Sequence, residues 1–384
     1  MTRTVPTSLA VPRTAISDSA AETEQAIRAI LAQNNFYRLD FDAPWLDKVF
    51  QAYRQPHRFF HTIDHLHSIC QLIVRHHSEA QEMTALLLLT ALFHDIVWYP
   101  QRNNNEEHSA QAFEMLRPSL GAELPQHSFD SVRTAIISTK RLQDADEMSA
   151  RFHSYDCDIL LNGDPVDLLA YEFQIFREFQ YLSLADYRRG RSDFFQRFSR
   201  RFPESRTSMR FLIEYLERRR PRIGIYAGSF NPFHIGHQAI LEKAEMMFDK
   251  VVIAVGINPE KNGVHRKDER VEAVRRTLPF HEVVFFDTLL VDLLNKQAEL
   301  ADVTLVRGLR NGYDLDYETS QQCFIREMRP NTSSVYLPCD KELEHISSSA
   351  LRGLLNFDCH GMADRYLPHV YDYFYKSVKD DFRL

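Results

Sequence analysis

Two histidines stand three residues apart, directly after a glycine-containing turn, in the C-terminal half of the sequence. The segment GSFNPFHIGHQAI places His234 and His237 at the expected start of a helix. Free backbone N–H groups and the helix dipole favour an anion at such a position. A histidine pair by itself is more often structural, but here the turn, the histidines and the helix start coincide. Together they predict a site for a polyphosphate.

A second group of candidate residues lies in the N-terminal half, where several histidines are gathered between residues 57 and 108. In the segment TALFHDIVWYP an apolar helix is expected to end in His94 and Asp95, which offer one nitrogen and one oxygen ligand to a single divalent ion. Histidines in HRFFHTIDHLHSIC and acids in SYDCDILLNG can complete the shell. Carboxylate-containing ligand sets suit Mn²⁺, Fe²⁺, Mg²⁺ or Zn²⁺. We therefore expect a divalent metal site in this half.

The spacing of the apolar residues predicts the helices and strands that position these candidate residues. Between residues 21 and 220 the apolar residues recur at helical spacing, which predicts an all-α domain. After Pro221, short apolar runs alternate with helical stretches, and this pattern predicts a parallel sheet with crossover helices. The expected strands are 223–227, 250–256, 282–286, 303–306 and 334–338. The sequence therefore predicts an all-α domain at 21–220 and an α/β domain at 221–384, after a disordered tail at 1–20.

The composition excludes several classes of protein. With 384 residues, of which 44% are hydrophobic and 26% charged, the chain fits about two globular domains. Its longest apolar stretch, residues 85–93, is too short for a bilayer span. A net charge of −7 points to neither nucleic acid nor an anionic membrane, and the arginine-rich segment 188–222 has the apolar spacing and acids of a solvated helix. Five scattered cysteines without a C-x-x-C pair are typical of a reducing cytoplasm.

The C-terminal half resembles the bacterial phosphopantetheine adenylyltransferase family of the nucleotidylyltransferase superfamily, over about residues 222–367. The H-x-G-H segment, NPEKN, DERV, RGLRNGYDLDYE and HISSS carry the resemblance. It implies a Rossmann-like fold and the transfer of AMP from ATP, with Mg²⁺, to 4'-phosphopantetheine, giving dephospho-coenzyme A and pyrophosphate. Nicotinamide or nicotinate mononucleotide adenylyltransferases are the alternative, since they share GSFNPxHxGH. They lack RGLR followed by DYE.

The resemblance also implies the roles of particular residues. An incoming phosphate oxygen is already a nucleophile, so the protein needs to align two anions and neutralise charge at the α-phosphate. The catalytic residues carried over from the family are His237, Lys261 and Arg307. The residues expected to bind ATP are Ser229, Phe230, His234, His237, Gly308, Leu309, Arg310, Glu318, Ser347, Ser348 and Ser349. Those expected to bind phosphopantetheine are Ser229, Lys261, Leu290 and Arg307.

Some of these positions have a plainer interpretation or depart from the family pattern. Glu318 could orient Arg310, and Ser347 could be a simple helix N-cap. Ser229 stands where the family usually has Thr, and its hydroxyl survives. Ile325 stands where the family usually has Asn, which changes the expected pantetheine contacts.

The N-terminal half resembles the HD superfamily of metal-dependent phosphohydrolases over about residues 47–201, through RFFHTIDH, FHDIVW, NNNEEHSA and DCDILL. This resemblance implies the metal ligands His65, His94, Asp95 and Asp158, with His61 and Asp156 as the alternates to the first and last. Glu106 and Glu107 are expected to orient water or a ligand. A bound ion would lower the pKa of its water and hydrolyse a phosphate ester. The alternative is a regulatory or assembly domain without catalysis.

Together the two resemblances predict a cytoplasmic enzyme of coenzyme A biosynthesis, an adenylyltransferase fused to a metal-dependent phosphohydrolase. The adenylyltransferase family often forms hexamers, so we expect a homo-oligomer. The expected partners are ATP and phosphopantetheine, with no membrane or nucleic acid.

Overall fold

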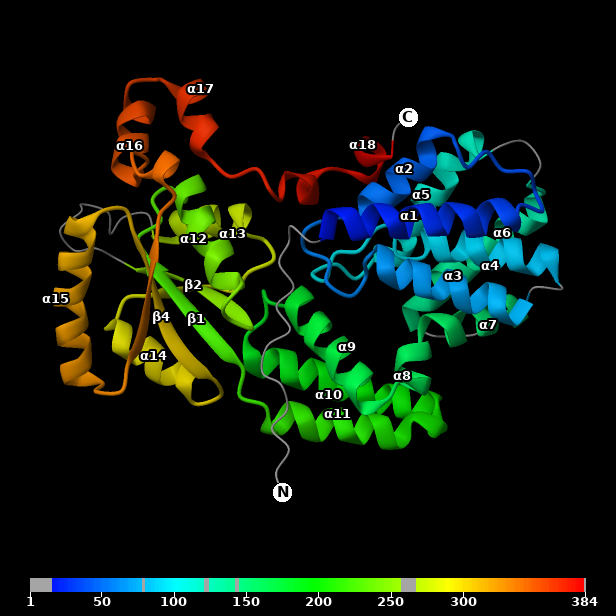
Figure 1. Ribbon diagram of the computed structural model, residues 1–384, viewed down its shortest axis with the longest axis horizontal. Helices are drawn as coiled ribbons and strands as arrows, with labels where there is room; N and C mark the ends of the chain where they lie inside the picture. The colour runs from blue at the N-terminus through cyan, green and yellow to red at the C-terminus, as the bar shows by residue number, and fades with distance from the viewer. Residues whose placement is uncertain (1–15, 78–79, 121–123, 142–144, 257–266, 383–384) are drawn as a thin grey trace. The chain divides into compact units, whose positions relative to one another are not determined.

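The computed structural model describes residues 16–77, 80–120, 124–141, 145–256 and 267–382 (Figure 1). The chain packs into two compact units. The sheet unit comprises residues 179–192 and 215–372, and the helical unit comprises residues 16–178, 193–214 and 373–382. This division is not the single boundary at Pro221 that the periodicity predicts, because two helices are shared and the C-terminal segment joins the helical unit.

The helical unit is built around one helix that is apolar on every side. Its helices are α1 (Ile16–Gln33), α2 (Pro44–Tyr53), α3 (Ile63–His77), α4 (Gln81–Phe93), α5 (Asn105–Leu116), α6 (Gln126–Ser138), α7 (Glu147–Asp156), α8 (Asp158–Asn162) and α9 (Pro165–Glu178), with α18 (Val378–Asp381). Residues 84–93 of α4 are all buried, and α3, α5, α6 and α7 pack around them. Burial on all faces is what a helix without a polar face requires. Among the described helices, none has the length and apolar character needed to span a bilayer.

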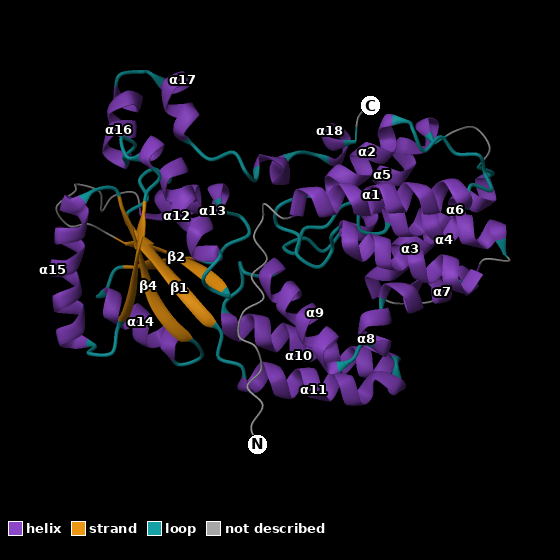
Figure 2. Ribbon diagram, viewed as in Figure 1, coloured by secondary structure: helices purple, strands orange, loops and turns teal. Residues whose placement is uncertain are grey.

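Five parallel strands form the sheet of the other unit, as the sequence predicts (Figure 2). They are β1 (Arg222–Gly228), β2 (Lys250–Gly256), β3 (Val283–Phe286), β4 (Asp302–Leu309) and β5 (Ser333–Pro338), in the order β3-β2-β1-β4-β5. The helices of this unit are α12 (Ile235–Glu245), α13 (Lys267–Thr277), α14 (Leu290–Ala298), α15 (Gly312–Met328), α16 (Ser348–Asn356) and α17 (His360–Ala363). The direction of strand addition reverses between β1 and β4. In open α/β sheets, ligands bind beyond the strand ends at this point.

The helices α10 (Leu184–Arg201) and α11 (Arg206–Arg218) contribute residues to both units. A buried lysine explains why the segment before α10 belongs with the sheet. Lys250 of β2 donates from Nζ to the carbonyl of Gln180 at 2.6 Å and pairs with Glu282 at 2.8 Å. A buried ammonium group needs such partners, and they anchor residues 179–183 to the sheet unit.

Candidate functional site

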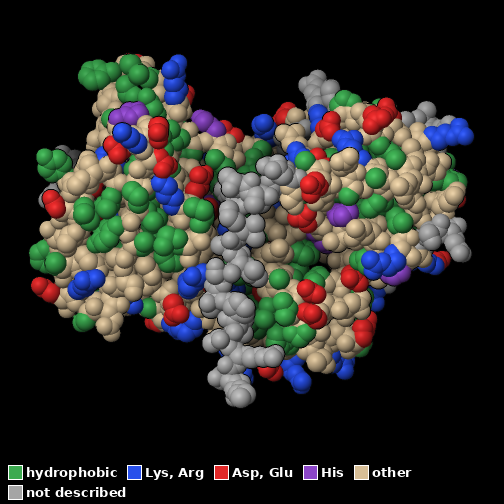
Figure 3. All heavy atoms as spheres, viewed as in Figure 1, with side chains coloured by type: hydrophobic (Ala, Val, Ile, Leu, Met, Phe, Trp, Pro, Cys, Tyr) green, Lys and Arg blue, Asp and Glu red, His purple; other side chains and the backbone are tan. Residues whose placement is uncertain are grey.

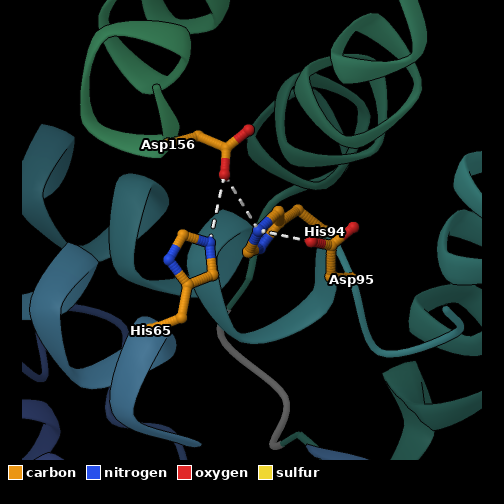
Figure 4. A group of neighbouring side chains, drawn as sticks. All are labelled: His65, His94, Asp95 and Asp156. Atoms are coloured by element: carbon orange, nitrogen blue, oxygen red, sulfur yellow. Dashed lines mark ion pairs between the residues drawn. The ribbon is translucent and has the colours of Figure 1, made fainter. Parts of the chain in front are cut away.

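Four side chains of the helical unit bring their ligand atoms together at the end of α4 (Figure 4). His65 comes from α3, His94 and Asp95 directly follow α4, and Asp156 is the last residue of α7. One ligand atom from each of the four lies within 4.8 Å of the others. The burial of α4 therefore carries two polar residues into the centre of the unit, where α3 and α7 supply the other two.

Both histidines of this cluster turn Nε2 toward the carboxylates. His94 Nε2 lies 3.2 Å from Asp95 Oδ2 and 3.4 Å from Asp156 Oδ1, and His65 Nε2 lies 3.4 Å from the same Asp156 oxygen. Neither buried Nε2 finds a hydrogen bond of sound geometry among the described residues. His94 Nδ1 is 2.8 Å from the carbonyl of Ala91, so a proton on Nδ1 leaves the Nε2 lone pair facing the cluster. This is the orientation of a metal-binding imidazole.

The electrostatics of the cluster favour a cation. Burial opposes charge on His94, yet the nearby carboxylates of Asp95 and Asp156 raise its pKa well above the usual value. Burial likewise opposes charge on Asp156, yet His65 and His94 hold its pKa below the usual value. One buried and one half-buried carboxylate thus favour positive charge between them, which either an imidazolium or a divalent ion can supply.

Asp158, the preferred fourth ligand in the sequence analysis, lies outside this cluster. It begins α8, and its carboxylate accepts a hydrogen bond from Asn162 Nδ2 at 2.7 Å. The helix breaks at Cys157, so that the alternate residue, Asp156, faces α3 and α4 instead. The leucine spacing that favoured Asp158 has another cause, because Leu160 is a buried core residue of α8.

His61, the alternate upstream histidine, stands beside the cluster and is not one of the four. Its Nε2 lies 3.8 Å from Asp95 Oδ2, and its Nδ1 lies 2.6 Å from Glu178 Oε2. The imidazole stacks on the indole of Trp98, with ring centroids 3.8 Å apart and an interplanar angle of 29°. His61 is therefore held on one side by a carboxylate and on its face by an aromatic ring.

Glu178 organises this edge of the site. Its Oε1 accepts the backbone N–H groups of Phe59, Phe60 and His61 at 2.8 to 2.9 Å, and its Oε2 also accepts from Trp98 Nε1 at 3.0 Å. Burial raises the pKa of Glu178, but His61 and the backbone donors outweigh it and bring the pKa to about 2. Glu178 could not be found from the sequence, because it is 117 positions from His61 and no local motif marks it.

The two glutamates expected near the metal site have different surroundings. Glu107 is exposed and pairs with Lys140. Glu106 is half-buried, and burial together with the charge of Asp95 raises its pKa. Of these two glutamates, Glu106 is therefore the one whose pKa the charge of Asp95 raises.

The second candidate site lies where β1 and β4 end. After β1 the chain turns through Phe230, whose φ of 42° is in the left-handed region. The Phe230 ring lies over Gly228, where a Cβ atom would come within 2.9 Å of the ring. Glycine is required by this close contact, which shapes the turn leading into α12.

His234 and His237 cap the start of α12 reciprocally. The backbone N–H of His237 donates to His234 Nδ1 at 3.3 Å, and that of His234 donates to His237 Nδ1 at 3.2 Å. The rings stack with centroids 3.6 Å apart. Burial lowers the pKa of His234 to about 4 and that of His237 well below its usual value. Both rings are therefore neutral at pH 7, and because each Nδ1 accepts, each Nε2 carries a proton that it can donate.

Two arginines at the end of β4 are held by different acids. Arg307 donates from Nη1 to the carbonyl of Ala227 at 2.7 Å, and its Nε lies 3.0 Å from Glu318 Oε2. Arg310 binds Asp314 through Nε at 2.9 Å and Nη2 at 3.0 Å. Asp314, and not Glu318, thus orients Arg310, while Glu318 pairs with Arg307. The two arginines place positive charge at the strand ends where β1 and β4 meet.

The serines of the HISSS segment join α16 to the turn after β1. Ser347 is the N-cap of α16 and accepts the N–H of the residue three positions on at 3.1 Å. Ser348 donates from its hydroxyl to the carbonyl of Pro232 at 3.0 Å. Arg352, which the sequence analysis missed, donates to the carbonyl of Asn231 at 2.6 Å and to Ser349 at 2.9 Å. Its only local signal is a cation three residues after the last serine.

The remaining residues that the sequence predicts for this site are described by their positions in the sheet unit. Lys261 lies outside the described residues. At Gly308 a Cβ atom would meet Ile240 of α12 at 2.9 Å, so the absence of a side chain lets α12 pack against β4. The others lie at the end of β4, after β1, at the start of α14 and on the buried side of α15: Leu309, Ser229, Leu290 and Ile325.

The sheet unit matches known proteins. Residues 225–354 match the model of the cytidylyltransferase-like family. A phosphopantetheine adenylyltransferase from Clostridium perfringens is 36% identical over 140 residues, which are 36% of this chain and 84% of that protein. The C-terminal half belongs to the phosphopantetheine adenylyltransferase family. Family members from Kocuria rhizophila and Streptococcus pneumoniae are 39% and 37% identical, over 33% and 35% of this chain and 82% and 85% of their own lengths.

Replacing Glu178 with Gln is expected to lower the free energy of unfolding of the helical unit at pH 7 by about 3 kcal/mol. The folded-state pKa of about 2 lies below the ordinary value of 4.5. The carboxylate therefore stabilises the fold above about pH 4.5, and this stabilisation is lost as the pH falls toward 2. Urea unfolding of the EDTA-treated chain, followed by tryptophan fluorescence, measures it, since Trp45 and Trp98 are the two tryptophans and both lie in this unit.

Glu147→Gln is the matched control, because the Glu147 carboxylate pairs with Arg151 on the surface. This change is expected to cost less than about 0.5 kcal/mol at either pH. An equal effect of Glu178→Gln at pH 7 and pH 3 would contradict the assignment of a buried, ionised Glu178.

Proposed function

We propose that the C-terminal half transfers AMP from ATP to 4'-phosphopantetheine, releasing dephospho-coenzyme A and pyrophosphate. Its relatives are named for this activity. The observation that carries the proposal is the pair of neutral histidines at the start of α12, beside the reversal of strand order. Their Nε2–H groups are donors at a position where a helix N-terminus already favours phosphate.

The chemistry that this site must perform is modest. A phosphate oxygen of phosphopantetheine attacks the α-phosphorus of ATP, and pyrophosphate leaves with the bonding electron pair. His237 donates a hydrogen bond to the α-phosphate oxygens, where negative charge grows in the transition state. Arg307 and Lys261 bind the substrate phosphates. Mg²⁺ bound with ATP neutralises further charge.

The other proposed contacts follow the placement of the residues. Arg310 directly follows β4. In this proposal it binds ATP together with Gly308 and Leu309 at the end of that strand. Glu318 contacts the adenosine moiety while holding Arg307. Ser348 connects the start of α16 to the turn after β1. We propose that residues of both segments contact the phosphates: Ser229, Phe230, His234, Ser347, Ser348 and Ser349. Ser229 and Leu290 contact the pantetheine.

His237→Ala is expected to lower the rate of adenylyl transfer about a hundredfold, because one donor to the transition state is lost. Pyrophosphate release with ATP, Mg²⁺ and 4'-phosphopantetheine measures the rate. His360→Ala, which removes an exposed histidine, is expected to leave the rate unchanged. Turnover of the unaltered chain with nicotinamide mononucleotide only would contradict the proposed acceptor.

We further propose that the helical unit binds a divalent cation through His65, His94, Asp95 and Asp156. Two buried imidazole nitrogens aimed at the buried carboxylate of Asp95 and the half-buried carboxylate of Asp156 support this site. Two nitrogen and two oxygen donors suit Mn²⁺, Fe²⁺ or Zn²⁺, and Mg²⁺ through the oxygens. When bound, the ion activates a water and polarises a phosphoryl oxygen, which permits hydrolysis of a phosphate ester. In this proposal Glu106, whose pKa the charge of Asp95 helps to raise, orients that water.

Asp156→Asn and Asp158→Asn form a matched pair that tests the ligand set. The first is expected to raise the dissociation constant for Mn²⁺ at least tenfold, because the cluster loses one of two anionic ligands. The second is expected to leave it unchanged, since Asp158 lies outside the cluster. Isothermal titration with MnCl₂ measures both, and the opposite order would contradict the ligand set.

Phosphate release from nucleotides and other phosphate esters, measured on the same variants, separates catalysis from regulation. Loss of hydrolysis in Asp156→Asn alone supports a phosphohydrolase. Metal binding without hydrolysis of any ester tested would instead favour the regulatory alternative.

We also propose that the chain forms a homo-oligomer through the outer face of α15. Exposed apolar side chains recur there at helical spacing, and Tyr313, Tyr317 and Phe324 are 86%, 60% and 60% exposed. Figure 3 shows hydrophobic side chains along this edge of the sheet unit. A stripe of this kind on a solvated surface marks an interface.

Sedimentation equilibrium is expected to give a mass that is a multiple of 45.0 kDa. The double change Tyr317→Glu and Phe324→Glu is expected to give the monomer, because it places two charges in the proposed interface. Phe357→Glu, an exposed apolar residue outside α15, is the control and is expected to keep the oligomer. A monomeric unaltered chain would contradict the proposal.

A further inference from the structure

The end of the chain belongs to the helical unit, although it follows the adenylyltransferase fold in the sequence. The sheet unit ends at Asp372, and residues 373–382 pack with the helical unit. Val378 and Phe382 are buried, and α18 packs against α5 (Figure 1). The C-terminal segment, residues 373–382, is therefore anchored by apolar side chains at its far end.

At its near end the C-terminal segment binds His57. The imidazole contacts two aromatic rings that also contact each other, with centroids 5.4 Å from Tyr99 and 5.6 Å from Tyr373. His57 Nε2 is 2.7 Å from the carbonyl of Trp98, and Nδ1 is 2.7 Å from the hydroxyl of Tyr373. Burial lowers the pKa of His57 to about 3, so the ring is neutral. A carbonyl can only accept, so Nε2 donates and Nδ1 accepts from Tyr373.

Arg102 makes the second attachment. Its guanidinium lies over the rings of Tyr99, at 4.3 Å, and Phe374, at 5.0 Å, and Nη2 donates to the carbonyl of Phe374 at 2.6 Å. The backbone N–H of Tyr99 donates to Oδ1 of Asn105 at the start of α5, and Nδ2 of Asn105 donates to the carbonyl of Tyr99. The C-terminal segment thus packs against the loop of residues 98–102.

This loop leads to the metal cluster. The Trp98 carbonyl is held by His57, which Tyr373 binds, while the Trp98 indole stacks on His61 and donates to Glu178. His61 in turn lies 3.8 Å from the carboxylate of Asp95. Four successive contacts therefore join the C-terminal segment to a residue of the cluster.

We propose that the C-terminal segment positions Trp98, and through it His61, at the edge of the metal cluster, so that this site is complete only when the chain's own C-terminus is docked. The proposal rests on the metal site proposed above. It makes the end of the adenylyltransferase half a part of the other site. Tyr373, Phe374 and His57 are positioning residues, because none of them reaches the cluster itself.

A purely structural anchor would hold α5 and α18 together without affecting Trp98. The test therefore uses the full chain with Trp45→Phe, so that Trp98 is the single tryptophan. Into this background are placed Tyr373→Phe, which removes one hydroxyl, and the double change Tyr373→Ala with Phe374→Ala. Tyr375→Phe is the matched control, because that ring is 56% exposed in the same segment.

Trp98 emission and the dissociation constant for Mn²⁺ are measured on each chain, with pyrophosphate release by the adenylyltransferase half as a check on folding. The double change is expected to shift Trp98 emission, as the indole leaves the imidazole, and to raise the Mn²⁺ dissociation constant about tenfold. Tyr373→Phe is expected to give a smaller change of the same kind. Tyr375→Phe is expected to change neither, and adenylyl transfer should stay within about twofold throughout.

Trp98 emission that is the same in the double variant and its parent would overturn the proposal. The emission also separates this proposal from the metal site on which it rests. A parent chain that binds no Mn²⁺ contradicts the metal site, whereas the shift of Trp98 emission still decides whether the C-terminal segment positions the indole. An emission shift with an unchanged Mn²⁺ dissociation constant contradicts the coupling to the cluster.

Discussion

The cost of burying polar groups without partners is the constraint on which both halves of this protein depend. In the helical unit, α4 is apolar on every side and must lie in the core, so the residues that directly follow it are carried inside with it. His94 and Asp95 then need partners, which α3 and α7 provide. In the sheet unit the free N–H groups at the start of α12 are met by the rings of two histidines. The same rings leave their other nitrogens available for a ligand.

Features that depend on local pattern could be predicted from the sequence, and features that depend on distant contacts could not. Short apolar runs that alternate with helical stretches predicted the five parallel strands, because each buried strand is itself a short apolar run. The one-residue break between α7 and α8 brings Asp156, and not Asp158, next to His65, His94 and Asp95. The spacing of residues in the sequence does not reveal so short a break in a helix. Glu178 and Tyr373 are brought to the N-terminal histidines only by the fold, from 117 and 316 positions away.

Each of the two units is made of several separate segments of the sequence. Periodicity placed a boundary at Pro221, where the strands begin. Lys250 instead holds residues near 180 to the sheet unit, and Tyr373 with Phe374 holds the C-terminus to the helical unit. Such contacts leave no local mark in the sequence, because the residues involved are ordinary members of a helix or a loop. They nevertheless bring residues 373–382, which follow the sheet in the sequence, into the helical unit.

Anomalous diffraction from crystals grown with Mn²⁺ is the most direct test of the metal site that we propose at His65, His94, Asp95 and Asp156. We expect one anomalous peak bound by Nε2 of His65, Nε2 of His94 and the carboxylates of Asp95 and Asp156. A peak bound by Asp158 in place of Asp156, or no peak at these residues while the ion is bound elsewhere, would contradict it.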